Sequence, residues 1–294
     1  MQRITPNIWC NGTADEARDF YLEAFAGLET TPETSLIHHN TYPTEGLLDF
    51  QQPFAGKTLT NEISLGGFHL ILINAGDEFQ PNPSINFFVN FDPSAMENPR
   101  EKLDALWEKL VDGGRVLMEL GDYDYSPRYG WVEDKYGVSW QLMLTNPEGD
   151  PRPLIVPQLM FCGDAQGRAE EAIAVYTDVF ADSRVGNVVK YPHNDEVVFS
   201  DFQLLGEWFA AMDSAVPQDF TFTEGVSLMV QADGQEEIDR LWSSLAEQEQ
   251  PCGWCTDRFG VRWQIVPSNL GELMQSPGAY EKLMGMSRIV IADF

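Results

Sequence analysis

The pattern of apolar and polar positions along the chain predicts amphipathic helices. Two segments carry apolar residues at the spacing i, i+3, i+4, i+7, which places one apolar stripe on an otherwise polar helix. Two further segments repeat apolar residues every four positions, which also keeps them on one helix face. These positions are Leu103, Leu106, Trp107 and Leu110; Ile238, Leu241, Trp242 and Leu245; Ala17, Tyr21 and Phe25; and Ala172, Tyr176 and Phe180. We expect them to form the buried faces of four helices.

Short apolar runs between these helices predict β-strands. Asp134 and Gly137, like Asp257 and Gly260, stand at the first and fourth positions of a type I turn, which joins two antiparallel strands. Each half therefore contains two βαβββ units. The expected strands cover residues 4–10, 68–73 and 85–91 in the first half and residues 155–162, 208–212 and 226–230 in the second.

The sequence is an internal duplication. The order Gly-Trp-x-x-Asp-[Lys/Arg]-[Tyr/Phe]-Gly-Val-x-Trp-Gln begins at Gly130 and returns without a gap at Gly253. Residues 146–153 are rich in turn formers and nearly free of apolar side chains, which is typical of a linker. We predict a first domain at 1–146, a linker at 147–153 and a second domain at 154–294. The fold class is α+β, and each domain is expected to form its own curved, mostly antiparallel sheet with its own ligand cup.

Composition and charge exclude several classes of function. The chain has 294 residues, with 18 Lys and Arg against 46 Asp and Glu and a formal net charge of -28. Nucleic-acid binding relies on Lys and Arg to neutralise phosphates, so no nucleic-acid partner is expected. The sequence contains no apolar run long enough to span a membrane and starts without the apolar core of a signal peptide, which predicts a cytoplasmic location. Cys252 and Cys255 form a CxxC on a predicted strand, where positions three apart face opposite ways, so no zinc or redox role is expected.

Five segments of the second half carry a resemblance to a known family. They are Pro157–Gly163, Ala169–Ala172, Glu236–Trp242, Cys252–Trp254 and Trp263–Pro267. Together they resemble the PhnB-like family, also called 3-demethylubiquinone-9 3-methyltransferase-like, of the glyoxalase, bleomycin-resistance and extradiol-dioxygenase superfamily (vicinal oxygen chelate fold). The resemblance implies tandem glyoxalase-like domains. Methyl transfer is not expected, because it usually needs a strand, a Gly-rich turn and a helix in a parallel doubly wound sheet, and no such unit is legible here.

The resemblance also implies where a metal would bind. Metal enzymes of this superfamily draw His, Gln or Glu from the first, fourth, fifth and eighth strands. Neutral amides beside residues that are not ligands make a poor donor set for a divalent ion, so neither a metal nor another cofactor is expected. The corresponding positions are Pro6 or Asn7 and Pro157 or Gln158; apolar residues at 71–73 and 210–212; Ser84 and Gly225; and Gln141 and Gln264.

Candidate ligand-binding residues come from these strands and from one insertion. Gln141 and Gln264 each follow a Trp on a strand, so one side chain of each pair faces the helices and the other faces the concave side of the sheet. The stretch from Leu110 to Gly130 is much longer than its repeat and is rich in Tyr and Asp. We expect it to form a loop beside the first cup that suits a flat or cationic ligand. The full candidate set is Asn7, His69, Tyr123, Tyr125, Tyr129, Gln141, Gln158, Trp208 and Gln264.

Two classes of function remain open. The first is a metal-independent binding protein that encloses a small, partly apolar molecule, as bleomycin-resistance proteins of this superfamily do by sequestration. The second is a metal-dependent lyase, isomerase or dioxygenase whose ligands are not recognisable in the sequence. Both imply a small-molecule partner, and a homodimer of the whole chain is compatible with either.

Overall fold

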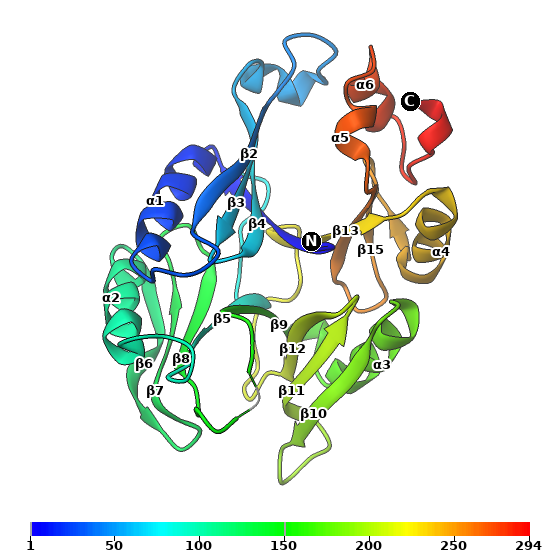
Figure 1. The fold of residues 1–294 in the computed structure, drawn as a ribbon. Coiled ribbons are helices and arrows are strands. Elements are labelled where there is room, and N and C mark those ends of the chain that lie inside the picture. Colours follow the sequence, from blue (N-terminus) through cyan, green and yellow to red (C-terminus); the bar gives the residue numbers. More distant parts are fainter. Residues whose placement is uncertain (1, 150) are drawn as a thin grey trace.

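The computed structural model describes residues 2–149 and 151–294 and contains two eight-stranded sheets (Figure 1). In sheet A the strand order is β14 (Gln248–Glu249), β15 (Trp254–Thr256), β16 (Arg262–Pro267), β13 (Val226–Ala232), β1 (Ile4–Asn11), β4 (Phe68–Ala75), β3 (Thr58–Leu65) and β2 (Ser35–Thr41). In sheet B the order is β10 (Arg184–Lys190), β11 (Val197–Leu204), β12 (Glu207–Asp213), β9 (Ile155–Phe161), β5 (Ile85–Phe91), β8 (Ser139–Leu144), β7 (Ser126–Glu133) and β6 (Arg115–Tyr123). The α+β class is confirmed, and all the expected strands are present.

Each sheet is shared between the two halves of the sequence. The central pairs are β1 with β13, where Asn7 lies opposite Ser227, and β5 with β9, where Asn86 lies opposite Gln158. Both of these pairs are antiparallel. The expectation that each half would form its own sheet and its own cup is therefore wrong. An alternating pattern assigns the two faces of a strand, but it carries no information about which strand lies beside it.

Four main helices cover one face of the sheets, and shorter helical segments lie elsewhere. In Figure 1, α1 and α2 flank one side of the molecule, and α3 and α4 flank the other. None of the helices in the described parts of the chain is long and apolar enough to cross a membrane. The helices are α1 (Ala14–Ala26), α2 (Pro99–Val111), α3 (Ala169–Val179), α4 (Gln235–Leu245), α5 (Leu270–Leu273) and α6 (Ala279–Met284), with 3-10 segments η1 (Asp49–Phe54), η2 (Gly163–Ala165) and η3 (Ile291–Asp293).

The two faces of each sheet differ in chemistry. Trp140 and Trp263 are fully buried against the helices and belong to one large apolar core that continues through both halves. Gln141 and Gln264 follow them on the strands and therefore face the other way. We call the face of sheet A that points away from the helices cup A, and the corresponding face of sheet B cup B.

The repeated motif has a structural role centred on a buried aspartate. The Asp134 carboxylate accepts hydrogen bonds from the Tyr21 hydroxyl at 2.7 Å and the Trp140 indole at 2.8 Å. It also accepts from the backbone N–H groups of Tyr136 and Val138 in the predicted turn. Burial raises the pKa of Asp134 to about 6, against the lowering effect of these hydrogen bonds. The motif thus ties α1 to the turn between β7 and β8.

The second copy of the motif makes the same contacts. The Asp257 carboxylate accepts from the Tyr176 hydroxyl at 2.6 Å and from the Trp263 indole at 2.9 Å. In both turns the glycine N–H donates to the aspartate carbonyl, Gly137 at 2.9 Å and Gly260 at 3.0 Å, as expected for the predicted turns. The Asp, Gly and Trp positions of the repeat therefore have a structural role in both halves.

Candidate functional site

The nine residues predicted to bind a ligand divide between the two cups. Asn7, His69 and Gln264 lie on strands of sheet A. Strands or turns of sheet B carry the other members: Tyr123, Tyr125, Tyr129, Gln141, Gln158 and Trp208. Because the sheets are shared, the carboxamides meet across the halves, with Asn7 beside Gln264 at 3.5 Å and Gln158 beside Gln141 at 2.5 Å. Each carboxamide thus contacts one from the opposite half of the sequence.

A hydrogen-bonded cluster of carboxamides forms the floor of cup B. The Gln141 amide nitrogen donates to Gln158 Oε1 at 2.5 Å and to Asn86 Oδ1 at 2.8 Å. The Tyr129 hydroxyl donates to Gln141 Oε1 at 2.5 Å. All four side chains are buried. They hold a polar, uncharged surface in fixed orientation beneath the cup.

Sequence reasoning missed Asn86. It placed the fifth-strand position at Ser84, two residues earlier, although residues two apart on a strand share a face. The register of β5 against β9 sets Asn86 directly opposite Gln158, and this pairing joins residues from different halves. The available signal was the polar Asn86 at the start of an apolar run, but its partner could not be found without the sheet order.

The walls of cup B are apolar and aromatic. Phe88, Val156 and Ala210 pack with Tyr129 in a small apolar cluster that is separate from the main core. A cavity of about 210 Å³ opens on this face and is closed on one side by the linker. Its lining residues are Phe88, Asn90, Asp92, Met143, Thr145, Asn146, Gly149, Arg152, Val156, Phe199, Asp201, Trp208 and Ala210. Of the predicted residues, Trp208 lines the cavity directly.

The tyrosine-rich insertion is a β-hairpin, and not the loop that the sequence predicted. It extends β6 and β7 and turns between Tyr123 and Ser126. The rings of Tyr123, Tyr125 and Tyr129 contact one another. The ring centres are 5.6 Å apart for Tyr123 and Tyr125, 5.4 Å for Tyr123 and Tyr129, and 5.1 Å for Tyr125 and Tyr129. Tyr129 is buried next to Gln141, whereas Tyr125 is 57% exposed. The trio therefore forms one edge of cup B, and its contact with a ligand remains a prediction.

Near cup A, segments from both halves of the chain meet. The Gln51 amide, in η1, lies 4.0 Å from the Met284 sulfur at the end of α6. His69 Nδ1 lies 2.8 Å from Glu62 Oε1 on the neighbouring strand. Burial raises the pKa of Cys252, beneath α6, to about 11, the opposite direction from the lowered pKa of a reactive thiol.

A larger hollow, of about 670 Å³, lies outside both cups, between the end of β1 and the turn that joins β7 to β8. Much of its lining is turn backbone, including Gly113, Gly114 and Gly137. Its aspartate, Asp134, is already saturated by hydrogen bonds. We therefore place the candidate site in cup B.

The positions that the family resemblance implies for metal ligands can now be located on the sheets. In cup B they are Gln158, Ala210, Asn86 and Gln141; in cup A they are Asn7, Ile71, Ser227 and Gln264. Neither set contains an anionic donor, and the amide nitrogen of Gln141 already donates to its neighbours. In the described residues there is also no group of three His, Cys, Asp or Glu placed to hold a metal. These donors do not fit a divalent cation.

Comparison with known proteins shows first the fold and then the family of this chain. Glyoxalase I from Zea mays is 14% identical, with a TM-score of 0.58 over 93% of this chain and 97% of that chain. The protein therefore has the tandem fold of glyoxalase I. The family model of 3-demethylubiquinone-9 3-methyltransferase matches residues 2–143 and 153–266, and the chain belongs to this family. This result confirms the resemblance seen in the sequence.

Single-domain relatives are also similar to part of the chain. A PhnB protein from Bacillus cereus is 28% identical and covers 49% of this chain and 100% of that chain, with a TM-score of 0.40. Comparison with curated proteins found no match.

Proposed function

We propose that the protein binds a small, partly apolar molecule in cup B without the help of a metal ion. The observation that carries this proposal is the buried cluster of neutral carboxamides, which lies on the same face of sheet B as an aromatic cavity. Polar groups fixed at the base of an apolar pocket are the usual means of orienting a ligand. Here Gln141, Gln158 and Asn86 occupy the positions at which metal enzymes of the superfamily place their ligands, and they offer amide hydrogen bonds instead.

We infer that methyl transfer, which the family description names, is not the activity of this chain. The main support is the sheet topology, in which most strand pairs are antiparallel. Methyl transfer from S-adenosylmethionine usually uses a parallel doubly wound sheet with a Gly-rich turn that leads into a helix. Gly66 and Gly67 join β3 to β4, so this glycine pair leads into a strand. A cytoplasmic location and a homodimer remain predictions from the sequence.

We expect the purified protein to carry no stoichiometric divalent metal. Elemental analysis after purification without chelator should give far less than one zinc, nickel, iron or manganese ion per chain. A chelator should leave the melting temperature unchanged, because a metal that binds only the native state would raise it. About one ion per cup, lost together with thermal stability on chelation, would instead support the metal-dependent lyase, isomerase or dioxygenase.

Filling cup B should abolish ligand binding. Ala210 lies on the cavity wall of β12, and Ile71 is its counterpart on β4 in cup A. We expect Ala210→Phe to remove the thermal shift caused by small molecules that stabilise the wild-type chain, and Ile71→Phe to preserve it. Circular dichroism would verify that both variants fold, since added bulk costs about 1–3 kcal/mol in a tight core. Retained binding in Ala210→Phe with loss in Ile71→Phe would move the site to cup A.

A further inference from the structure

The Arg152 side chain, from the linker, places a guanidinium group in cup B. The guanidinium carbon of Arg152 lies 4.0 Å from the centre of the Trp208 ring, within the range of a cation–π contact. Arg152 Nη2 also lies 2.6 Å from Asp201 Oδ2. The Asp201 side chain is only 8% exposed. An aromatic face and a nearly buried carboxylate together make a cation site, and the Arg152 side chain occupies it.

The walls of this site lie on paired strands, whereas its occupant lies in a connecting segment. Trp208 and Asp201 stand on the paired strands β12 and β11, the third and second strands from one edge of sheet B. The Asp201 carboxylate also accepts from the Asn187 backbone N–H at 2.6 Å, which fixes it on the strand. Arg152 belongs to the segment between β8 and β9, which forms no helix or strand at its described positions. Loops of this kind move at lower free-energy cost than paired strands.

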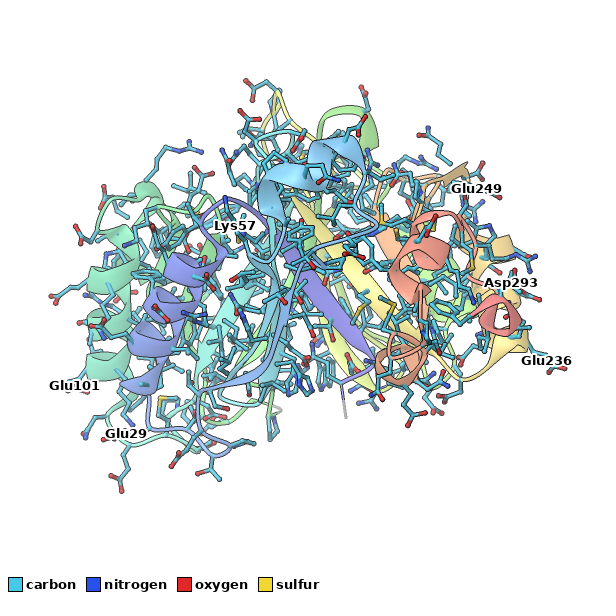
Figure 2. The ribbon with its side chains drawn as sticks, turned by 90° about the horizontal axis from the view of Figure 1, so that it is seen from above. Glu29, Lys57, Glu101, Glu236, Glu249 and Asp293 are labelled. Carbon is cyan, nitrogen blue, oxygen red and sulfur yellow. The ribbon has the colours of Figure 1, made fainter. Side chains whose placement is uncertain are left out.

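The charges around the cavity favour a cation once Arg152 is withdrawn. Among its described lining residues, Asp92 and Asp201 are acidic and Arg152 is basic. Without the Arg152 side chain, two carboxylates would remain in the cavity lining together with Trp208 and Phe199, and the Arg184 guanidinium carbon would stay 5.4 Å from the centre of the Trp208 ring. The whole chain carries a net charge of -28, which raises the local concentration of cations. Figure 2 shows acidic side chains on both flanks of the molecule, with Glu101 on one side and Glu236 on the other.

We propose that cup B binds a flat organic cation, such as an amidinium or guanidinium on an aromatic body, in the place held by the Arg152 side chain. This inference rests on the proposed function for the location of the site and adds the class of ligand. The ligand would stack on Trp208, pair with Asp201 and fill the neighbouring cavity. Arg152 competes for the same contacts and so sets the affinity of the site.

Removing the Arg152 side chain distinguishes a cationic ligand from an anionic one. A ligand with a carboxylate would use Arg152 as a partner and would bind more weakly without it. A cationic ligand would gain the vacated Trp208 face and an unpaired Asp201 carboxylate, and would bind more tightly. The sign of the change in affinity therefore reports the charge of the ligand.

The experiment compares benzamidinium with benzamide, a neutral probe of nearly the same shape, by isothermal titration calorimetry. We expect Arg152→Ala to bind benzamidinium at least tenfold more tightly than the wild type and to bind benzamide within twofold of it. Adding Asp201→Asn to Arg152→Ala should cancel the gain. The matched control is Arg184→Ala, which removes another cation near Trp208, at 5.4 Å, but leaves the Arg152–Asp201 pair in place. It should change benzamidinium affinity by less than threefold.

Three outcomes would overturn the inference. They are equal benzamidinium affinity in Arg152→Ala and the wild type, a gain of the same size in Arg184→Ala, and no binding of benzamidinium to any variant. If both probes bind equally well to wild type and variant, the site accepts flat molecules and the proposed function stands, while the cation class fails.

The cavity-filling pair Ala210→Phe and Ile71→Phe tests the proposed function independently. Should Arg152→Ala fail to fold, Arg152→Met keeps an unbranched apolar stem on Trp208 and serves for the same titration.

Discussion

Replacing Asp134 by alanine will lower the free energy of unfolding by about 3–5 kcal/mol. The carboxylate accepts four hydrogen bonds from groups that lie in or beside the core, including the Tyr21 hydroxyl and the Trp140 indole. Alanine would leave these donors without acceptors, and each buried donor without a partner costs about 1–3 kcal/mol. Urea unfolding followed by circular dichroism would measure the loss.

Two controls make this expectation specific. Asp257→Ala removes the equivalent acceptor from the second copy of the motif and should be destabilising by a similar amount. Asp124→Ala changes an exposed residue of the β6–β7 turn and should alter the free energy by less than about 0.5 kcal/mol. If Asp134→Ala unfolds at the same urea concentration as Asp124→Ala, the motif does not have the structural role described here.

Separating the two halves of the chain will abolish the monomeric fold of each. A fragment of residues 1–149 would expose one edge of β1 and one edge of β5, because their antiparallel partners β13 and β9 lie in the second half. Unpaired central strands of this kind associate with other strands. We expect each fragment to form dimers or aggregates alone, and a mixture of residues 1–149 with 151–294 to give a one-to-one complex with the spectrum of the intact chain.

Size-exclusion chromatography with light scattering would detect the change in mass, and near-ultraviolet circular dichroism would report the packing of Trp140 and Trp263. A full-length chain cleaved once in the linker is the matched control and should keep both sheets. A soluble, monomeric first half with cooperative unfolding would contradict the shared sheets. It would also support the predicted division at 1–146 and 154–294 as a division into independent domains.

The sequence was sufficient to predict part of the candidate site. The Trp-Gln pairs identified Gln141 and Gln264 as residues that share their strands with buried tryptophans, because strand alternation is a local property. The importance of Arg152 was not visible, since it lies in a segment that reads as a linker. Its contact with Trp208 and Asp201 joins residues about 50 positions apart, and no local pattern encodes such a distance.

The sequence by itself determined the duplication, the α+β class, the apolar stripes of the main helices and the positions of the expected strands. These features depend on periodicity within short segments, where the spacing of apolar residues is sufficient. Only the tertiary structure decided that β1 pairs with β13 and β5 with β9, and therefore which carboxamides meet in which cup. Two copies of one unit present nearly equivalent strand edges. Pairing within a half and pairing across halves bury similar apolar faces, so the choice depends on the packing of the whole chain.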